Sequence, residues 1–476
     1  MKIKTRHFIA LLALAWCPYA GAQEAVPPQG SAAPTQQAGY FDFLGGLAYT
    51  DNALLTSSQQ TGDGIGMAGF SADYMRKGNL TLNLLGNLER LEYLHHSFAG
   101  SFYGQFFGLG VLGKPTDLLQ WQLAENFGEE MTDPLAAPTP VNLQTINEVS
   151  TGPQINFHFG LTYRLTLSGR YSRTTYQRSP FDSQTYRGGV QFQHELSGAS
   201  SLSVEASTAH TRYVDSYAVR SYFSGSNGYD IQSASFLYEA RFVRTQVLLR
   251  AGYNSIRYGG ASARSEPLYQ VRLSRRISPF STVYIGGQQT YSSNGESLSS
   301  PGARVGLQVG ATLNPGYAVA QPFSHRAADV GWLFHRARTS LALTGSYGED
   351  VYQQTVSTQQ PNQQDESAAA VLGRQLSPTT MVRLRVDGYW IHYAGVGARS
   401  RREDMQLTFS KRMARTTISL YVERQQQSGA SGQSAFFSTS YHDDRVGIYV
   451  TYDLVGARSM GALPLGVTGM GAFAGG

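Results

Sequence analysis

The stretch from Asp404 to Glu423 carries the pattern that decides the fold. It reads Asp404-Met405-Gln406-Leu407-Thr408-Phe409-Ser410, then a short link, then Thr417-Ile418-Ser419-Leu420-Tyr421-Val422-Glu423. Apolar and polar residues alternate in both halves, so each half predicts a β-strand with one apolar and one polar face. Two such strands joined by a short link form a hairpin. Because the pattern recurs along most of the chain, we expect one closed sheet.

Composition and hydropathy favour a membrane barrel over a soluble protein of several domains. The chain has 476 residues, is rich in Gly (52) and Tyr (29), and is only 15% charged. After residue 22 no apolar run is long enough for a membrane-spanning helix. Apolar residues instead alternate over segments of about ten residues, as they do in outer-membrane barrels. Since only helices and closed barrels satisfy every backbone group in lipid, we expect an all-β fold, a transmembrane antiparallel β-barrel.

The chain divides into four expected parts. Residues 1–22 predict a signal peptide: a basic start, an apolar run from Phe8 to Trp16, and Ala20-Gly21-Ala22 before the cleavage site. Residues 23–39 predict a flexible periplasmic lead-in, 40–455 the barrel, and 456–476 a Gly-rich tail. The one cysteine, Cys17, lies in the signal peptide, so the mature protein is expected to have no thiol chemistry. An exported protein of this kind is not expected to bind nucleic acid.

The number of alternating segments predicts about twenty strands, within a range of 18 to 22. Short turns alternate with longer connections, which predicts short periplasmic turns, longer extracellular loops and both chain ends in the periplasm. Residues 127–146 predict a Pro-rich loop. Residues 303–313 also alternate, inside a connection from 293 to 325, and predict either an extra strand or a loop folded into the pore. A barrel of about twenty strands is expected to have an open or loop-plugged lumen.

Several short motifs carry a resemblance to a known family. They are Tyr49-Thr50-Asp51-Asn52-Ala53-Leu54-Leu55-Thr56, Ser150-Thr151-Gly152-Pro153, Gly169-Arg170-Tyr171-Ser172-Arg173-Thr174-Thr175-Tyr176 and Asp182-Ser183-Gln184-Thr185-Tyr186-Arg187-Gly188-Gly189. Over roughly residues 40–455 the chain resembles the exosortase-associated (PEP-CTERM-system) outer-membrane β-barrels, the EpsL-type proteins of exopolysaccharide operons. The resemblance implies a barrel in the bacterial outer membrane that takes part in exopolysaccharide biosynthesis and export. It implies no catalytic residues and no cofactor.

Arginines on the polar faces are the candidate functional residues. Five lysines (Lys2, Lys4, Lys77, Lys114, Lys411) stand among 38 basic residues, so Arg dominates, which suits side chains held in a structured polar interior. An arginine-lined lumen could guide an anionic glycan, although arginines paired with carboxylates are ordinary in porins. The expected lumen or entrance arginines are Arg164, Arg170, Arg272, Arg276, Arg374, Arg383, Arg385 and Arg412.

Charge is also expected to vary along the pore. Basic residues such as Arg276, Arg374 and Arg412 fall near the periplasmic ends of the strands. The acidic pairs fall near the outer ends: Glu349-Asp350, Asp365-Glu366, Glu403-Asp404 and Asp443-Asp444. A basic entrance and an acidic exit would suit an anionic polymer, whereas acidic rims could equally bind divalent cations with lipopolysaccharide. Aromatic residues at strand ends predict an interfacial girdle: Tyr171, Tyr176, Tyr253, Tyr258, Tyr291, Trp390 and Tyr393.

Three functions remain open from the sequence. The first is a polysaccharide conduit, with outer-membrane lipid and lipopolysaccharide, exopolysaccharide, the barrel-assembly machinery and periplasmic polysaccharide-export proteins as partners. The second is a general diffusion porin or a structural barrel. The third, an outer-membrane enzyme, is disfavoured because His442-Asp443-Asp444, the nearest thing to a catalytic cluster, alternates between the faces of one strand. No metal site is expected.

Overall fold

The computed structural model of the chain describes residues 36–58, 60–114, 116–132, 137–215, 227–259, 262–292, 322–352, 362–394, 397–430 and 440–455. The expected signal peptide, the lead-in up to residue 35, the segment 303–313 and the tail 456–476 lie outside these residues. The described chain forms twenty strands: β1 (Gln36–Thr50), β2 (Asp63–Lys77), β3 (Leu80–Tyr93), β4 (Ser101–Leu112), β5 (Leu119–Met131), β6 (Leu143–Phe159), β7 (Tyr163–Tyr176), β8 (Ser183–Ser197), β9 (Ser200–Tyr213), β10 (Gly228–Arg241), β11 (Thr245–Tyr258), β12 (Arg264–Ser278), β13 (Ser281–Ser292), β14 (Phe323–Arg336), β15 (Thr339–Tyr352), β16 (Gln363–Ser377), β17 (Thr380–Tyr393), β18 (Ala398–Met413), β19 (Thr416–Ala430) and β20 (Tyr441–Asp453).

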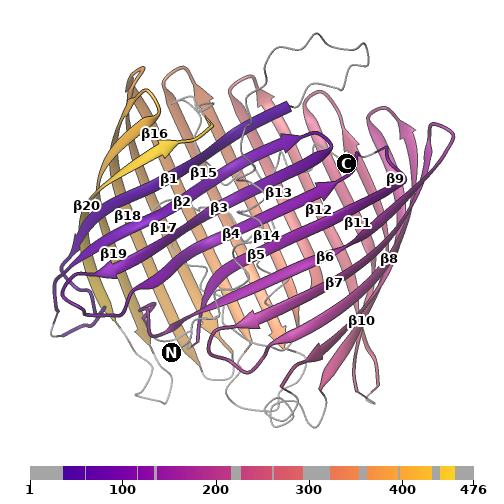
Figure 1. Cartoon of the computed structure of the whole chain (residues 1–476), viewed down its shortest axis with the longest axis horizontal. Helices are drawn as coiled ribbons and strands as arrows, with labels where there is room; N and C mark the ends of the chain where they lie inside the picture. Colours follow the sequence, from indigo (N-terminus) through magenta and orange to yellow (C-terminus); the bar gives the residue numbers. More distant parts are fainter. Residues whose placement is uncertain are drawn as a thin grey trace, which may run out of the picture.

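The strands close into a single antiparallel barrel (Figure 1). Each strand pairs with the next along the chain, and β20 pairs back with β1 from Asp42 opposite Asp453 to Thr50 opposite Arg445. The closing seam also carries a side-chain contact, because the Thr50 hydroxyl donates a hydrogen bond to the Asp443 carboxylate across it. Closure leaves no unpaired sheet edge around the ring, which is the condition for a sheet to span lipid.

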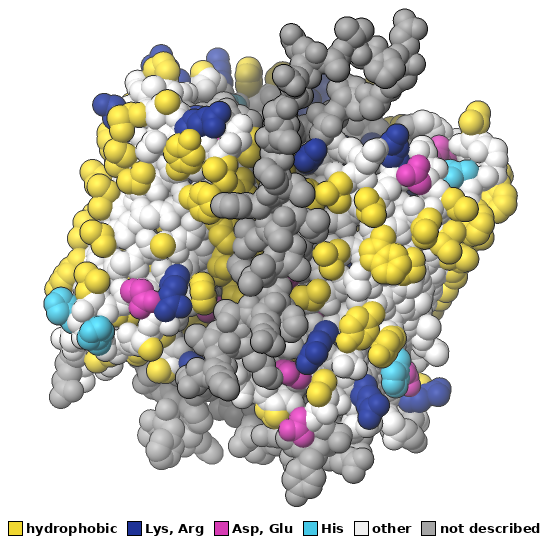
Figure 2. All heavy atoms as spheres, viewed as in Figure 1, with side chains coloured by type: hydrophobic (Ala, Val, Ile, Leu, Met, Phe, Trp, Pro, Cys, Tyr) yellow, Lys and Arg dark blue, Asp and Glu magenta, His cyan; other side chains and the backbone are white. Residues whose placement is uncertain are grey.

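The two faces of the sheet differ as the alternation predicts. On β19 and β20, Leu420, Val422 and Ile448 are exposed on the outer face, whereas Ser419 and Glu423 are buried on the inner face. Figure 2 shows hydrophobic side chains spread over the outer surface between the two ends of the barrel. An apolar outside around a polar lumen is the arrangement of a barrel that crosses the bacterial outer membrane. The protein is therefore an outer-membrane β-barrel, with short turns at the periplasmic end.

No helix within the described ranges is long and apolar enough to cross a membrane.

Three strands extend beyond the bounds expected from the sequence. β1 begins at Gln36, so the last four residues of the expected lead-in belong to the barrel. The expected Pro-rich loop over 127–146 is too long, because β5 continues to Met131 and β6 begins at Leu143. In the extension of β6, Leu143 and Ile146 are three residues apart and so break the period of two. Strands that rise above the apolar belt no longer need an apolar outer face. Hydrophobic alternation therefore cannot mark where they end.

The ladder between β4 and β5 is the shortest of those that the structure describes. Its pairs run only from Phe106 opposite Phe127 to Leu112 opposite Trp121. Toward the extracellular end, β4 pairs with β3 alone and β5 pairs with β6 alone. The two strands are thus paired on the periplasmic side of this seam, and above Phe106 and Phe127 they form no ladder with each other.

Two periplasmic turns place alanine in a left-handed conformation. Ala337 and Ala414 have φ angles of 50° and 52°, and each opens the two-residue connection of a hairpin. A side chain costs about 1–2 kcal/mol in this region, whereas glycine adopts it freely.

We expect Ala414→Gly to raise the free energy of unfolding by about 0.5–1 kcal/mol, because the relieved strain exceeds the added flexibility of the unfolded chain. Denaturant unfolding in detergent micelles measures the change. Ala199→Gly is the matched control, since Ala199 lies in another periplasmic turn and is not among the residues with positive φ. It should be neutral or slightly destabilising. An equal gain in both variants would contradict the strain argument.

Candidate functional site

The structure places seven of the eight expected arginines on the inner face. The residues opposite them in the ladders are lumenal as well, for example Gln193 opposite Arg164, Ser410 and Thr408 beside Arg383, and Thr417 opposite Arg412. The seven inner arginines are Arg164, Arg170, Arg272, Arg276, Arg383, Arg385 and Arg412. They are spread over four strands, β7, β12, β17 and β18, and do not converge on one point.

Arg374 is the exception. Its expected position in the lumen or entrance is wrong, because it lies on the outer face. It lies opposite Val382 and shares the outer face of β16 with Leu372 and Leu376, both exposed. Its guanidinium donates a hydrogen bond to the Thr339 hydroxyl on the neighbouring strand. Arg374 stands close to the periplasmic end, where a long basic side chain can reach the lipid headgroups while its stem covers apolar surface.

A patch of amides and arginines lines the lumen on β5 to β8, near the periplasmic turns at 113–118 and 160–162. We call it the amide–arginine patch and define it as Gln120, Gln122, Gln154, Asn156, Arg164, Arg170 and Gln193. Its amides are linked in a relay. The Gln122 amide donates to Gln154 (2.8 Å), and the Gln154 amide donates to Asn156 (3.0 Å). The Gln154 amide also donates to Gln120 at 3.2 Å.

The arginines of this patch are held by amides rather than by carboxylates. Arg164 donates to the Gln193 side-chain oxygen, and Arg170 donates to that of Gln122. One carboxylate, Glu148, lies within electrostatic range of Arg170, but it is shared with Arg187. Two guanidiniums therefore share one negative charge, and Arg170 and Arg187 are both exposed to the lumen. This arc of the wall carries an excess of positive charge.

The opposite wall, on β17 to β20, is charged but compensated. Arg385 pairs with Asp387, and both side chains are buried, at 7% and 5% exposure. Arg402 pairs with Asp404 at 3.3 Å, and Arg445 pairs with Asp443 at 2.6 Å. Two further expected arginines also meet carboxylates: Arg412 reaches Asp453 at 3.5 Å and Arg272 reaches Asp329 at 4.0 Å. The lumen is therefore asymmetric, because arginines held by amides line β7 whereas arginines paired with carboxylates line β17 to β20.

Strand alternation places only half of the expected acidic residues in the lumen. In each acidic pair near the extracellular end, one carboxylate faces inward and its neighbour faces outward. The inner ones are Asp350, Asp365, Asp404 and Asp443, and the outer ones are Glu349, Glu366, Glu403 and Asp444. Three outer carboxylates meet outer arginines, as in the Arg326–Glu349 pair at 3.3 Å. The same split separates Asp443 from His442 and Asp444, so these three residues form no common site.

The expected aromatic girdle is split in the same way. Tyr171, Tyr253 and Trp390 lie on the outer face, and Tyr253 is 70% exposed. In contrast, Tyr258, Tyr291 and Tyr393 are buried at the extracellular ends of their strands. Tyr258 and Tyr291 belong to an inner cluster with Tyr213, Tyr229 and Phe181. Rings of this cluster contact one another, with centroids 6.0 Å apart for Tyr229 and Tyr258, so they stiffen the mouth.

Sequence reasoning missed the amides of the patch. A usable signal was present, because Gln120-Trp121-Gln122 and Gln154-Ile155-Asn156 repeat an amide at every second position. This period places the amides on one face of each strand. A metal site needs a different constellation, and within the described ranges no group of three His, Cys, Asp or Glu side chains is arranged to hold an ion.

Comparisons with known proteins give distant likenesses in structure only. No family model and no curated protein matches the sequence. The siderophore receptor PirA from Acinetobacter baumannii is 11% identical, with 87% of this chain and 80% of that chain covered and a TM-score of 0.45. The copper transporter OprC is 10% identical, with coverages of 87% and 81% and a TM-score of 0.43. OccK2 of Pseudomonas aeruginosa is 10% identical, with coverages of 90% and 100% and a TM-score of 0.39. The fold assignment rests on the chain's own strand pairing.

Proposed function

We propose that this outer-membrane barrel conducts an anionic exopolysaccharide from the periplasm to the cell surface, without catalysis and without a cofactor. The observation that carries the proposal is the amide–arginine patch. Its arginines are satisfied by neutral amides, so their positive charge stays available to a passing anion. Its amides present both donors and acceptors, the groups that exchange hydrogen bonds with sugar hydroxyls.

The position of the patch fits loading from the periplasm. Gln120 and Arg164 each stand one residue inside their strands, next to periplasmic turns. A low-dielectric wall focuses the field of such charges and raises the local concentration of an anionic ligand. Guanidiniums also match carboxylates in bidentate geometry. The proposed partners are the acidic glycan, periplasmic polysaccharide-export proteins that deliver it, the assembly machinery that inserts the barrel, and the surrounding lipid and lipopolysaccharide. The family resemblance points to the same pathway.

A general diffusion porin is the second candidate. The compensated ion pairs on β17 to β20 favour it, because porin lumens ordinarily carry paired charges. A porin would pass small solutes steadily, and its loss would leave the polymer unaffected.

The test compares polysaccharide outside the cell with polysaccharide trapped in the periplasm. In a strain that lacks the protein, we expect high-mass polymer to fall outside and to accumulate inside. The double variant Arg164→Gln/Arg170→Gln should lower export roughly threefold or more, within the range by which charged clefts concentrate ligands. Both glutamines preserve the polar lining, so a fall in export reports the charge.

Arg374→Gln is the matched control, because it removes the same charge from the outer face. It should leave export unchanged. Equal effects of the inner and outer variants would show that the lumenal position is irrelevant. Unchanged polysaccharide together with altered uptake of small solutes or antibiotics would replace the conduit with a porin.

A further inference from the structure

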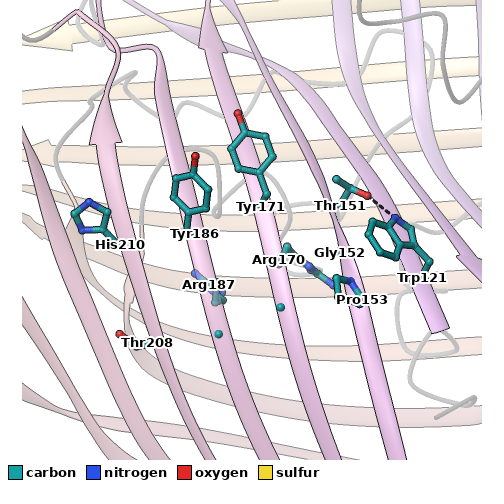
Figure 3. Close-up of a pocket in the computed structure, with 12 residues that line it drawn as sticks. Trp121, Thr151, Gly152, Pro153, Arg170, Tyr171, Tyr186, Arg187, Thr208 and His210 are labelled. Carbon is teal, nitrogen blue, oxygen red and sulfur yellow. Dashed lines mark hydrogen bonds between the residues drawn. The ribbon is translucent and has the colours of Figure 1, made fainter. Parts of the chain in front are cut away.

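A groove crosses the outer face of the barrel on β5 to β9 (Figure 3). We call it the outer groove and define it by Trp121, Gly169, Tyr171, Tyr186, Gly188 and His210, and its volume is about 550 Å³. Trp121 at one end donates a hydrogen bond to the Thr151 hydroxyl at 2.8 Å. A second hollow of similar volume, floored by Ala206 and Ala234, adjoins it through Gly188 and Thr208.

The groove faces the bilayer and not the lumen. On β8, Tyr186 shares its face with Val190 and Phe192, which are exposed apolar residues. Tyr171 lies opposite Tyr186, which in turn lies opposite His210. Below this row the floor is formed where Gly169 lies opposite Gly188. A methyl group added at Gly188 would meet no atom within 4 Å, so the hollow is open space in the lipid-facing wall.

Three arginines lie at the extracellular end of this groove. Arg173 and Arg212 flank Gln184 in the next row of the ladder beyond Tyr171 and Tyr186. Arg257 lies on the same outer face, opposite Asp230. Within the described ranges none of these three guanidiniums has a carboxylate at ion-pair distance. Asp230 is held instead by the His210 ring nitrogen at 2.7 Å.

Three outer arginines on the other side of the barrel differ. Arg326, Arg401 and Arg424 each pair with an outer carboxylate. The wall around the outer groove therefore joins an apolar, aromatic-rimmed hollow to three arginines at its extracellular end that have no ion-pair partner among the described residues. This combination matches a molecule with a long apolar chain and an anionic head.

We propose that the outer groove binds an anionic, phosphate-bearing lipid of the outer leaflet. One acyl chain lies over Gly169 and Gly188 between the aromatic side chains. The phosphate lies at Arg212 on β9, with Arg173 two strands away on one side and Arg257 two strands away on the other. The inference does not depend on the proposed conduit, because it concerns the opposite face of the wall.

The dimensions agree with one chain of a bilayer lipid. The groove crosses four inter-strand spacings of about 4.8 Å, which gives a length of about 19 Å. Because barrel strands are inclined by roughly 35–45°, a groove running across them is itself inclined to the membrane normal. Its depth is then close to one leaflet, half of the roughly 30 Å hydrocarbon core. The charged end lies near the extracellular ends of β7 and β9, where headgroups are found.

The test uses Trp121 as a reporter in reconstituted vesicles. The full-length chain carrying Trp332→Phe and Trp390→Phe leaves Trp121 as the tryptophan of the described barrel. Vesicles contain either brominated phosphatidylglycerol, which is anionic, or brominated phosphatidylethanolamine, which has no net charge. Bromine quenches tryptophan only on contact, so quenching in lipid mixtures gives relative occupancy of the groove.

We expect a preference of about threefold or more for the anionic lipid, and we expect Arg212→Gln/Arg257→Gln to abolish it. Gly188→Leu should fill the floor and reduce quenching by both lipids, without a fold penalty because its side chain enters open space. Arg401→Gln, an outer arginine on the far side, should change nothing. Circular dichroism confirms that each variant is folded.

Three outcomes would overturn the proposal. Equal quenching by both lipids in the unaltered wall would remove the headgroup contact. Loss of the preference on adding inorganic phosphate at millimolar concentration would make the arginines a plain anion site with no acyl-chain recognition. A change in oligomeric mass caused by Gly188→Leu would assign the groove to contact between copies of the chain.

Discussion

Replacing Arg385 with Gln is expected to lower the free energy of unfolding by about 3–5 kcal/mol, the usual cost of breaking a buried ion pair. Arg385 and its partner Asp387 are almost fully buried in the wall of β17. In the ladder, Asp387 lies directly opposite Asp404 on β18. Two carboxylates face each other across the strands, and like charges at opposed positions destabilise a sheet. Arg385 and Arg402 offset that repulsion, so removing one leaves a buried charge without its counterion.

The control restores charge balance without restoring the pair. In Arg385→Gln/Asp387→Asn, two neutral amides replace two charges of similar size, and most of the lost stability should return. Thermal unfolding in detergent, followed by circular dichroism, measures both variants. If the double variant is as unstable as the single one, packing by the arginine stem rather than electrostatics holds this part of the wall.

Gly252→Ala is expected to cost about 1–3 kcal/mol, because the added methyl group collides with backbone. A Cβ at Gly252 on β11 would lie 2.0 Å from the Ala234 carbonyl oxygen and 2.6 Å from the Ser235 Cα on β10. Neither atom can rotate away, since both belong to the ladder in which Gly252 lies opposite Ser235. The two strands must therefore move apart locally.

Gly188→Ala is the matched control, because it lies in a strand of the same barrel but its Cβ would meet nothing within 4 Å. Denaturant midpoints in micelles should fall for Gly252→Ala and stay within experimental error for Gly188→Ala. If both variants lose the same stability, the loss comes from placing alanine in a strand and not from the close approach of the β10 backbone at Gly252.

The barrel could be predicted from the sequence because lipid imposes a rule on every strand. Where the apolar belt crosses a strand, one face must be apolar, and the bounds of β3 and β7, Leu80–Tyr93 and Tyr163–Tyr176, agree with the alternation at both ends. Outside the belt that rule lapses. The first residues of β6, from Leu143, do not alternate with a period of two, so their sequence does not predict a strand.

The direction of each arginine was harder to predict than its strand. In β16 the run Ala368-Ala369-Ala370-Val371-Leu372 is apolar at every position, so it does not fix which face is inner. For Arg374 the prediction then rests on the expectation that a charged side chain points into the lumen. That prediction is wrong, because Arg374 lies at the membrane edge on the outer face. For Arg383 and Arg385, alternation with Leu384 and Val386 resolved the two faces correctly.

Side-chain partners on neighbouring strands could not be predicted, because they depend on register. Gln122 meets Arg170 only when β5, β6 and β7 are aligned as they are in the sheet, and a shift of one residue would send every one of these side chains to the lipid. The sequence indicates which residues are polar. It does not indicate whether an arginine will meet a glutamine or a carboxylate, which is the distinction on which the amide–arginine patch depends.

The short ladder between β4 and β5 has a mechanical consequence for the wall. A closed sheet resists lateral tension through its inter-strand hydrogen bonds, and it parts where the fewest must break. Above Phe106 and Phe127 the two strands form no ladder with each other, so no inter-strand hydrogen bonds of this ladder have to break there. The β4–β5 seam is thus the place on the circumference with the fewest inter-strand pairs, and the described pairs of this seam lie in its periplasmic half.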